Sequence, residues 1–261
     1  AQSDFTSSLY DELRFGFEVY LRRRLTGLIE GRLSYKYEEV DIFNVSPSIF
    51  FPIRKGKTRI SMVGMTFLRD TRDSLITSTR GSRLEFITEL IGGPLSGDID
   101  YYRLEGRAAK YLPIFRFQKQ VIEVIGRAGI VKEYGDTPTV PFFDRYFLGG
   151  PTTLRGFEFR DVGPKEQTVG EPIGGKTYAF GSVEYSFDIV DPLRFALFYD
   201  VGFVNKGAYY WDTSDYNDNW GFGIRFFVMG SPLRLDYGIP ITTDRFNDQG
   251  GQFNFSFGTR F

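Results

Sequence analysis

The chain has 261 residues, with no cysteine, no histidine and a formal charge of −1 from 32 basic and 33 acidic residues. The missing residue types exclude disulfide frameworks, thiolate metal sites and histidine-based acid–base catalysis, and the near-neutral charge gives no electrostatic reason to bind nucleic acid. We therefore expect no enzyme activity, no cofactor, no metal and no nucleic-acid partner.

Aromatic residues are unusually abundant. Phe 28, Tyr 16 and Trp 2 make up 18% of the chain, although 25% of the residues are charged and the mean hydropathy is −0.24. No apolar run approaches the roughly 18 residues that a transmembrane helix needs. A chain that is rich in both aromatic and charged residues, without a helical pattern, indicates a sheet with one apolar face and one wet face.

Segments of alternating apolar and polar residues follow one another from about Tyr10 to the end of the chain. Because successive side chains of a strand point to opposite faces, each segment predicts a strand. We count eleven, most of about ten residues, the length that a tilted strand needs to cross a bilayer. Their apolar positions lie in 13–21, 29–37, 60–68, 84–90, 102–104, 122–130, 183–187, 193–203, 220–228, 233–239 and 253–261. Residues 40–57 and 207–218 are predicted to be loops.

The charges on these segments recur in mid-strand on the polar face. In a soluble sandwich or propeller that face would meet solvent, whereas in a membrane barrel it lines the lumen and the apolar face meets lipid. The apolar face stays apolar in strand after strand, which favours the barrel. We predict an all-β fold, a transmembrane antiparallel up-and-down β-barrel, with residues 1–261 as one outer-membrane β-barrel domain.

The segment 149–163, GGPTTLRGFEFRDVG, is too long and glycine-rich for an ordinary connection between strands. We predict that the loop of about residues 144–173 folds into the lumen. A guanidinium carried there needs carboxylate acceptors. Glu184 and Asp200 have lumenal parity on the next two strands, and Gly202 suits a close approach of the loop. Arg155 is therefore expected to bridge Glu184 and Asp200; the alternative is an arginine exposed in an extracellular loop.

This loop resembles the sixth extracellular loop of the bacterial surface antigen family of outer-membrane barrels (BamA/TamA-like). Leu154, Arg155, Gly156 and Phe157 match its L/V-R-G-F/Y element. FLRDTRDSLITSTRGSRLEF resembles the family's periplasmic turn, and GSVEYSF and LFYDVGF match the wall motifs that receive the loop arginine. The resemblance covers the chain from about Tyr10 onward. It implies a loop lock made of Leu154, Arg155, Gly156, Phe157, Glu184, Asp200 and Gly202.

The last strand, FNFSFGTRF, resembles the aromatic C-terminal signal that such proteins present for membrane insertion. Phe253, Phe255, Phe257 and Phe261 share one face. Gly258 matches the glycine at which the family's last strand bends and weakens its seam with the first strand, and a glycine inside a strand marks weak pairing on physical grounds as well. The plainer alternative is that these aromatic side chains only cover lipid-facing surface.

The strand count conflicts with the resemblance. If the loop is extracellular, eleven strands would also start on the extracellular side, whereas bacterial barrels normally have an even number of strands and both ends in the periplasm. We therefore expect about twelve strands, the first absent or displaced. The alternative is the C-terminal part of a 16-stranded barrel. A twelfth strand hidden in residues 40–51 is disfavoured by Pro47.

The resemblance implies a protein that inserts or transports polypeptides at the bacterial outer membrane, through its lumen or its first–last strand seam, after export with a removed signal peptide. The implied partners are outer-membrane lipid, client outer-membrane polypeptides and periplasmic assembly partners. Insertases of the family carry polypeptide-transport-associated domains ahead of the barrel, and this sequence contains none. The alternatives are a structural or passive barrel that keeps the loop lock without insertase activity, and the membrane anchor of a larger protein.

Overall fold

The computed structural model describes residues 2–6, 11–45, 55–114, 119–168, 170–228, 231–247 and 250–260. They form one twelve-stranded sheet in which every strand pairs antiparallel with its neighbours in sequence. The strands are β1 (Gln2–Thr6), β2 (Asp11–Arg24), β3 (Ile29–Phe43), β4 (Gly56–Asp70), β5 (Gly81–Ile91), β6 (Tyr101–Pro113), β7 (Val121–Glu133), β8 (Thr177–Val190), β9 (Leu193–Asn205), β10 (Asn217–Val228), β11 (Ser231–Thr242) and β12 (Gln252–Phe257).

Among the described connections are two short 3-10 helices, η1 (Gly93–Leu95) and η3 (Phe142–Asp144). Within the described ranges, no helix has the length and apolar character needed to cross a membrane.

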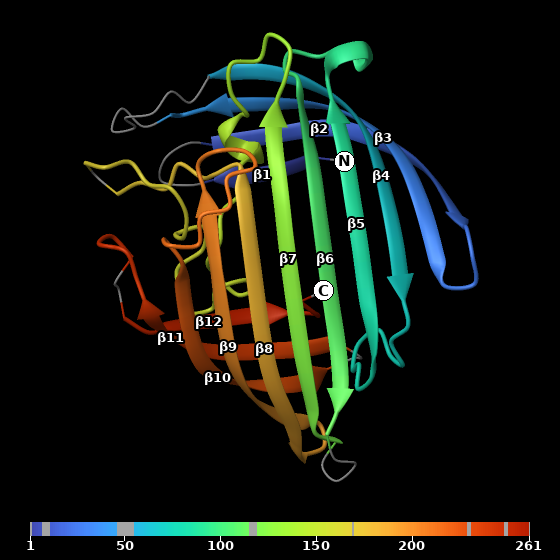
Figure 1. Cartoon of the computed structure of the whole chain (residues 1–261), viewed down its shortest axis with the longest axis vertical. Coiled ribbons are helices and arrows are strands. Elements are labelled where there is room, and N and C mark those ends of the chain that lie inside the picture. Colours follow the sequence, from blue (N-terminus) through green and yellow to red (C-terminus); the bar gives the residue numbers. More distant parts are fainter. Residues whose placement is uncertain are drawn as a thin grey trace.

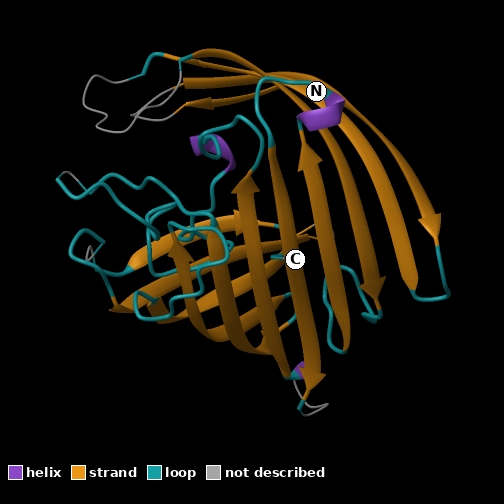
Figure 2. Cartoon of the chain, turned by 45° about the horizontal axis from the view of Figure 1, so that its top comes forward, coloured by secondary structure: helices purple, strands orange, loops and turns teal. Residues whose placement is uncertain are grey.

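The sheet curls strongly, so that it has a concave and a convex face (Figures 1 and 2). The described residues of β1 pair with β2 and those of β12 pair with β11, and no described pairing joins β1 to β12. The predicted all-β, antiparallel, up-and-down fold is confirmed, in the form of an open sheet.

The eleven predicted strands correspond to β2 through β12, and the twelfth is β1, within the chain and before Tyr10. Its register runs from Gln2 opposite Phe15 to Thr6 opposite Asp11. With twelve antiparallel strands, the start of β1 and the end of β12 lie at the same end of the sheet. The even count that the topology demanded is therefore met by a strand of five residues.

The loop predicted at residues 40–57 was partly wrong. β3 continues to Phe43 and β4 begins at Gly56, with Val40 opposite Thr58. Val40 and Ile42 are buried on the concave face among apolar residues that include Val140 from the connection after β7. Residues 46–51 of the proposed hidden strand lie outside the described residues. The second predicted loop, 207–218, ends slightly earlier because β10 begins at Asn217.

The two faces of the sheet follow the predicted parity. The convex face exposes large apolar side chains in strand after strand, among them Phe17, Phe86, Leu197 and Phe222. Charged side chains on the concave face are buried, namely Glu38, Glu105, Glu184, Asp200, Arg225, Arg234 and Asp236. This is the reverse of the arrangement in a soluble sheet, where the buried face is apolar.

Candidate functional site

The connection between β7 and β8 folds back onto the concave wall. Isolated antiparallel bridges join Tyr146 to Gly175 and Leu148 to Val162. The outgoing and returning parts of the connection therefore lie side by side. Gly149 enters the tip with a φ of +105°, and a Cβ there would lie 2.1 Å from the Glu158 carbonyl oxygen. This position therefore needs glycine, because an L side chain would be strained and would collide with the returning chain.

Apolar side chains hold the tip against the wall. Leu154 and Phe157 are fully or almost fully buried and belong to one cluster with residues of the loop and of β6 to β9. The cluster contains Ala109, Tyr111, Val121, Ile125, Leu148, Leu154, Phe157, Val162, Tyr178, Phe180 and Val204. Burying a large apolar side chain contributes roughly 1.5–3 kcal/mol, so these two contacts already favour the inward position of the loop.

Arg155 lies between these two anchors and is 0% exposed. Its Nε and Nη2 donate to the two carboxylate oxygens of Asp200, both at 2.9 Å, and its Nη1 donates to Glu184 Oε2 at 2.6 Å. The guanidinium also lies 3.3 Å from the centroid of the Phe198 ring. The structure therefore brings Arg155, Glu184 and Asp200 together. Arg155 makes a bidentate contact with Asp200 and a single contact with Glu184, and its guanidinium stacks over the Phe198 ring.

The charge of Arg155 is secured by its surroundings. Burial lowers the pKa of this guanidinium, but the carboxylates of Asp200 and Glu184 outweigh that effect and raise the pKa above its ordinary value. The side chain is cationic at any physiological pH, so the contact acts as a permanent ion pair.

Sequence reasoning missed the residues that extend this cluster. Arg225 of β10 donates to Glu184 Oε2 at 3.0 Å and to Asp236 Oδ1 at 2.6 Å, and Asp236 of β11 lies 3.7 Å from Arg155 Nη1. Both have polar-face parity, so alternation could place them on the concave wall. It could not show that they converge on Arg155, because parity gives the face of a side chain and not its height along the barrel.

The last strand contacts the loop directly. Asn254 of β12 donates to the Arg155 carbonyl oxygen at 2.7 Å. After Gly258, which has a φ of +96°, Arg260 turns onto the concave side and donates to Ser182 Oγ at 2.9 Å and to the Thr153 carbonyl at 3.1 Å. Arg260 thus bonds the C-terminal segment to the loop and to β8.

The predicted aromatic positions of the last strand lie on the convex face. Phe253, Phe255 and Phe257 are 67%, 61% and 66% exposed. Phe261 lies outside the described residues.

Two wall glycines make room for the loop. A Cβ at Gly202 would lie 2.6 Å from Leu148 Cδ1, so a loop side chain, rather than the predicted loop backbone, fills this space. The close backbone approach occurs at Gly238, where a Cβ would lie 2.5 Å from both the carbonyl carbon and the oxygen of Arg155. Gly156 lies equally close to the wall, with its Cβ position 2.5 Å from Asn219 Cβ.

Chemically, this arrangement is suited to holding the loop in place. Within the described ranges, no three acidic side chains are grouped so that they could hold a metal ion. The arginines and carboxylates of the loop lock form their ion pairs mainly with one another.

The chain matches the Omp85 superfamily domain over residues 1–261. Its sequence is 31% identical over 238 residues to "Outer membrane protein assembly factor BamA" of Nitratidesulfovibrio vulgaris, covering 87% of this chain and 29% of that protein. It is 27% identical over 243 residues to "SAM50-like protein CG7639" of Drosophila melanogaster, covering 86% of this chain and 52% of that protein. The chain thus spans about half or less of these relatives.

Two solved structures share the fold. BamA from Haemophilus ducreyi lacking POTRA domains 1–3 superposes with a TM-score of 0.80 at 20% identity, covering 98% of this chain and 57% of that one. CdiB from Acinetobacter baumannii superposes with a TM-score of 0.58 at 14% identity, covering 95% of this chain and 42% of that one.

Proposed function

Because the chain belongs to the Omp85 superfamily, we propose that it acts in the insertion or transport of polypeptides at the bacterial outer membrane. In this proposal residues 1–261 are an outer-membrane barrel domain, residues of about 144–173 are its lumen-inserted loop, and the chain is exported with removal of a signal peptide. Its partners are outer-membrane lipid, client outer-membrane polypeptides and periplasmic assembly proteins.

The names of the relatives support this direction. The bacterial relative is an outer membrane protein assembly factor, and a human relative that is 32% identical over 211 residues is a "Sorting and assembly machinery component 50 homolog". The exposed apolar residues of the convex face supply the surface that lipid would cover.

One observation carries the mechanism: β12 is bonded to the loop tip through Asn254, while no described pairing joins it to β1. An edge strand without a partner presents free backbone N–H and C=O groups to another strand. We therefore place client handling at the first–last strand seam, with the loop lock and the turn at Gly258 setting the position of β12.

The test is a covalent closure of this seam. Because the chain has no cysteine, pairs introduced into β1 (Gln2 to Thr6) and β12 (Gln252 or Ser256) would form the intended disulfides alone. We expect the pair that crosslinks in the membrane to abolish assembly of a client barrel protein into liposomes, and reduction to restore it. Each single-cysteine variant is the control and should assemble clients at the wild-type rate.

The outcome separates this proposal from its alternatives. If the crosslinked protein assembles clients as fast as the reduced protein, the seam mechanism fails. If the wild-type chain itself assembles no client although it is folded in the bilayer, a passive barrel or a membrane anchor that keeps the loop lock is the better description.

A further inference from the structure

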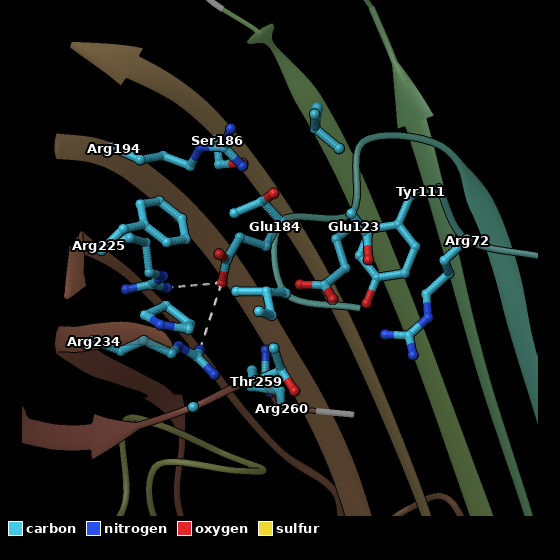
Figure 3. Close-up of a pocket in the computed structure, with 17 residues that line it drawn as sticks. Arg72, Tyr111, Glu123, Glu184, Ser186, Arg194, Arg225, Arg234, Thr259 and Arg260 are labelled. Carbon is cyan, nitrogen blue, oxygen red and sulfur yellow. Dashed lines mark hydrogen bonds and ion pairs between the residues drawn. The ribbon is translucent and has the colours of Figure 1, made fainter. Parts of the chain in front are cut away.

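A second group of arginines, Arg225, Arg234 and Arg260, lies next to the loop lock, on the side toward the end of β12. A cavity of about 80 Å³ opens there among residues from β6 to β11, the turn between β4 and β5, and the C-terminal segment. Figure 3 shows Arg225 and Arg234 reaching toward Glu184 from one side, with Thr259 and Arg260 beside them. A water-sized group needs about 10–15 Å³ of such space, so the cavity has room for a group with several oxygen atoms.

Three carboxylates, Glu184 in the cavity wall and Asp200 and Asp236 next to it, are already engaged. Glu184 Oε2 accepts from Arg155 at 2.6 Å and from Arg225 at 3.0 Å, and Asp236 Oδ1 accepts from Arg225 at 2.6 Å. Both carboxylate oxygens of Asp200 accept hydrogen bonds from Arg155. Four arginines, Arg155, Arg225, Arg234 and Arg260, thus share the three carboxylates Glu184, Asp200 and Asp236.

Of these four arginines, Arg234 has the poorest set of described partners. Its side chain is only 6% exposed, yet its described contacts are one hydrogen bond to Asp236 Oδ2 at 3.4 Å and an ion pair with Glu184 at 4.0 Å. An arginine carries five N–H donors, and a buried charge without good partners is costly. Arg234 therefore has donors to spare beside a cavity that it lines.

Arg260 also lines the cavity, and its guanidinium is only partly satisfied, with Nη1 on Ser182 and Nη2 on the Thr153 carbonyl. Its side chain is 1% exposed, and its Nε has no hydrogen-bond partner among the described residues. Arg260 comes from the C-terminal segment and Arg234 from β11, so the two guanidinium groups reach the cavity from different elements. Donors that converge from several directions suit a tetrahedral oxyanion better than a planar carboxylate.

Two other arginines line the cavity, and each has its own counter-ion. Arg72 is paired with Asp70 at 2.7 Å and Arg194 with Asp188 at 2.7 Å, so each carries its own counter-ion. Glu123 also lines the cavity and interacts electrostatically with Arg260, without a described ion pair to Arg234 or Arg260.

We propose that this cavity is a binding site for a phosphate-type oxyanion, held chiefly by Arg234 and Arg260 with Arg225 beside them. The anion accepts hydrogen bonds from donors that the carboxylates leave free, chiefly those of Arg234. Because the site joins β11 to the C-terminal segment, its occupation stabilises the inward turn after Gly258. The anion is either free phosphate or the phosphate of a lipid headgroup, and the site stands independently of the proposed assembly activity.

The test uses the whole chain folded in a non-ionic detergent, with thermal unfolding followed by the fluorescence of its two tryptophans. Sodium phosphate is titrated against sodium chloride at matched ionic strength. We expect phosphate to raise the unfolding temperature saturably beyond chloride, and Arg234→Gln to weaken the apparent affinity by about tenfold or more, since charge-assisted hydrogen bonds are lost. Arg32→Gln is the matched control, because Arg32 pairs with Glu18 on β2 away from the cavity, and should respond like the wild type.

A second measurement covers the case in which Arg234→Gln does not fold. Crystals of the wild-type chain soaked in tungstate should show an anomalous peak between Arg234 and Arg260. Short-chain phosphatidate distinguishes the two sources: tighter binding than phosphate identifies a lipid headgroup, and equal or weaker binding identifies free phosphate. The proposal is overturned if phosphate and chloride act alike on the wild type, or if both variants keep the wild-type affinity.

Discussion

Arg155 is a cation with no contact to solvent, and its ion pairs explain how the chain tolerates it. A buried charge is destabilising unless its hydrogen bonds are complete, and here Asp200 takes two N–H donors and Glu184 takes a third. Such a pair contributes little relative to an apolar replacement of the whole cluster. Removing one member, however, leaves the other buried with part of its charge and hydrogen bonds unsatisfied.

We therefore expect Arg155→Ala to lower the free energy of unfolding by about 3–5 kcal/mol, because Asp200 would lose its bidentate partner and keep only the more distant Arg260, at 3.5 Å. Asp200→Ala should cost a similar amount, and the double variant should cost clearly less than the sum, since the two side chains act as one unit. Thermal unfolding in detergent micelles measures all three. Glu158→Ala, an exposed side chain of the same loop, is the control and should change stability little; additive single effects would contradict the ion pair.

Much of this site was predictable residue by residue, for a definite reason. Glu184 and Asp200 could be chosen because a lumenal arginine needs carboxylates and both have inward parity on the next two strands. Arg225, Asp236 and Arg260 share that parity with many other charges. Their convergence depends on the curl of the sheet and on the turn at Gly258, which no local pattern encodes.

At the scale of elements, the loop and β11 fit together through the absence of one side chain. Gly238 lies in the interior of β11, where glycine weakens a strand and usually marks a close approach. The Arg155 carbonyl group and the Gly156 nitrogen occupy the space that a side chain would take. The strand therefore gives up some intrinsic stability so that the loop can reach Glu184 and Asp200.

Gly238→Ala tests this fit. The added Cβ would lie 2.5 Å from backbone atoms of Arg155, so the loop must retreat, and we expect a loss of about 1–3 kcal/mol. Gly126→Ala is the matched control, because a Cβ at Gly126 of β7 meets nothing within 4 Å. Chemical denaturation of both variants in micelles gives the two values. Equal stability of the two would show that the loop does not rest on β11.

The elements that sequence patterns missed are those whose neighbours decide their structure. β1, with a single large apolar residue at Phe5, is too short to show an alternation of its own and exists through its pairing with β2. The upper end of β3 has an apolar concave face because Val140 and its neighbours cover Val40 and Ile42. A loop was predicted there, because the packing that makes this end of the strand apolar comes from a connection far away in the sequence.

At the scale of the whole molecule, the two faces of the sheet define what surrounds it. A soluble protein rarely exposes contiguous apolar surface beyond a few hundred Å², whereas this convex face carries exposed Phe, Leu, Ile and Val side chains from β2 to β12. Lipid is the solvent that such a wall fits. The concave face, with its buried charges and the loop packed on it, needs no contact with lipid at all.

Leu197→Arg puts this to the test, because Leu197 lies in the middle of β9 with its side chain on the convex face. If the wall meets hydrocarbon, a guanidinium there should make folding into a phospholipid bilayer less favourable by about 2–4 kcal/mol, since an arginine near the midplane loses its hydration. Tyr216→Arg, in the exposed connection before β10, should cost far less. Folding titrations with urea in the presence of liposomes yield both free energies from one assay. An equal cost at the two positions would mean that β9 does not face the membrane interior, and the barrel assignment of the wall would have to be abandoned.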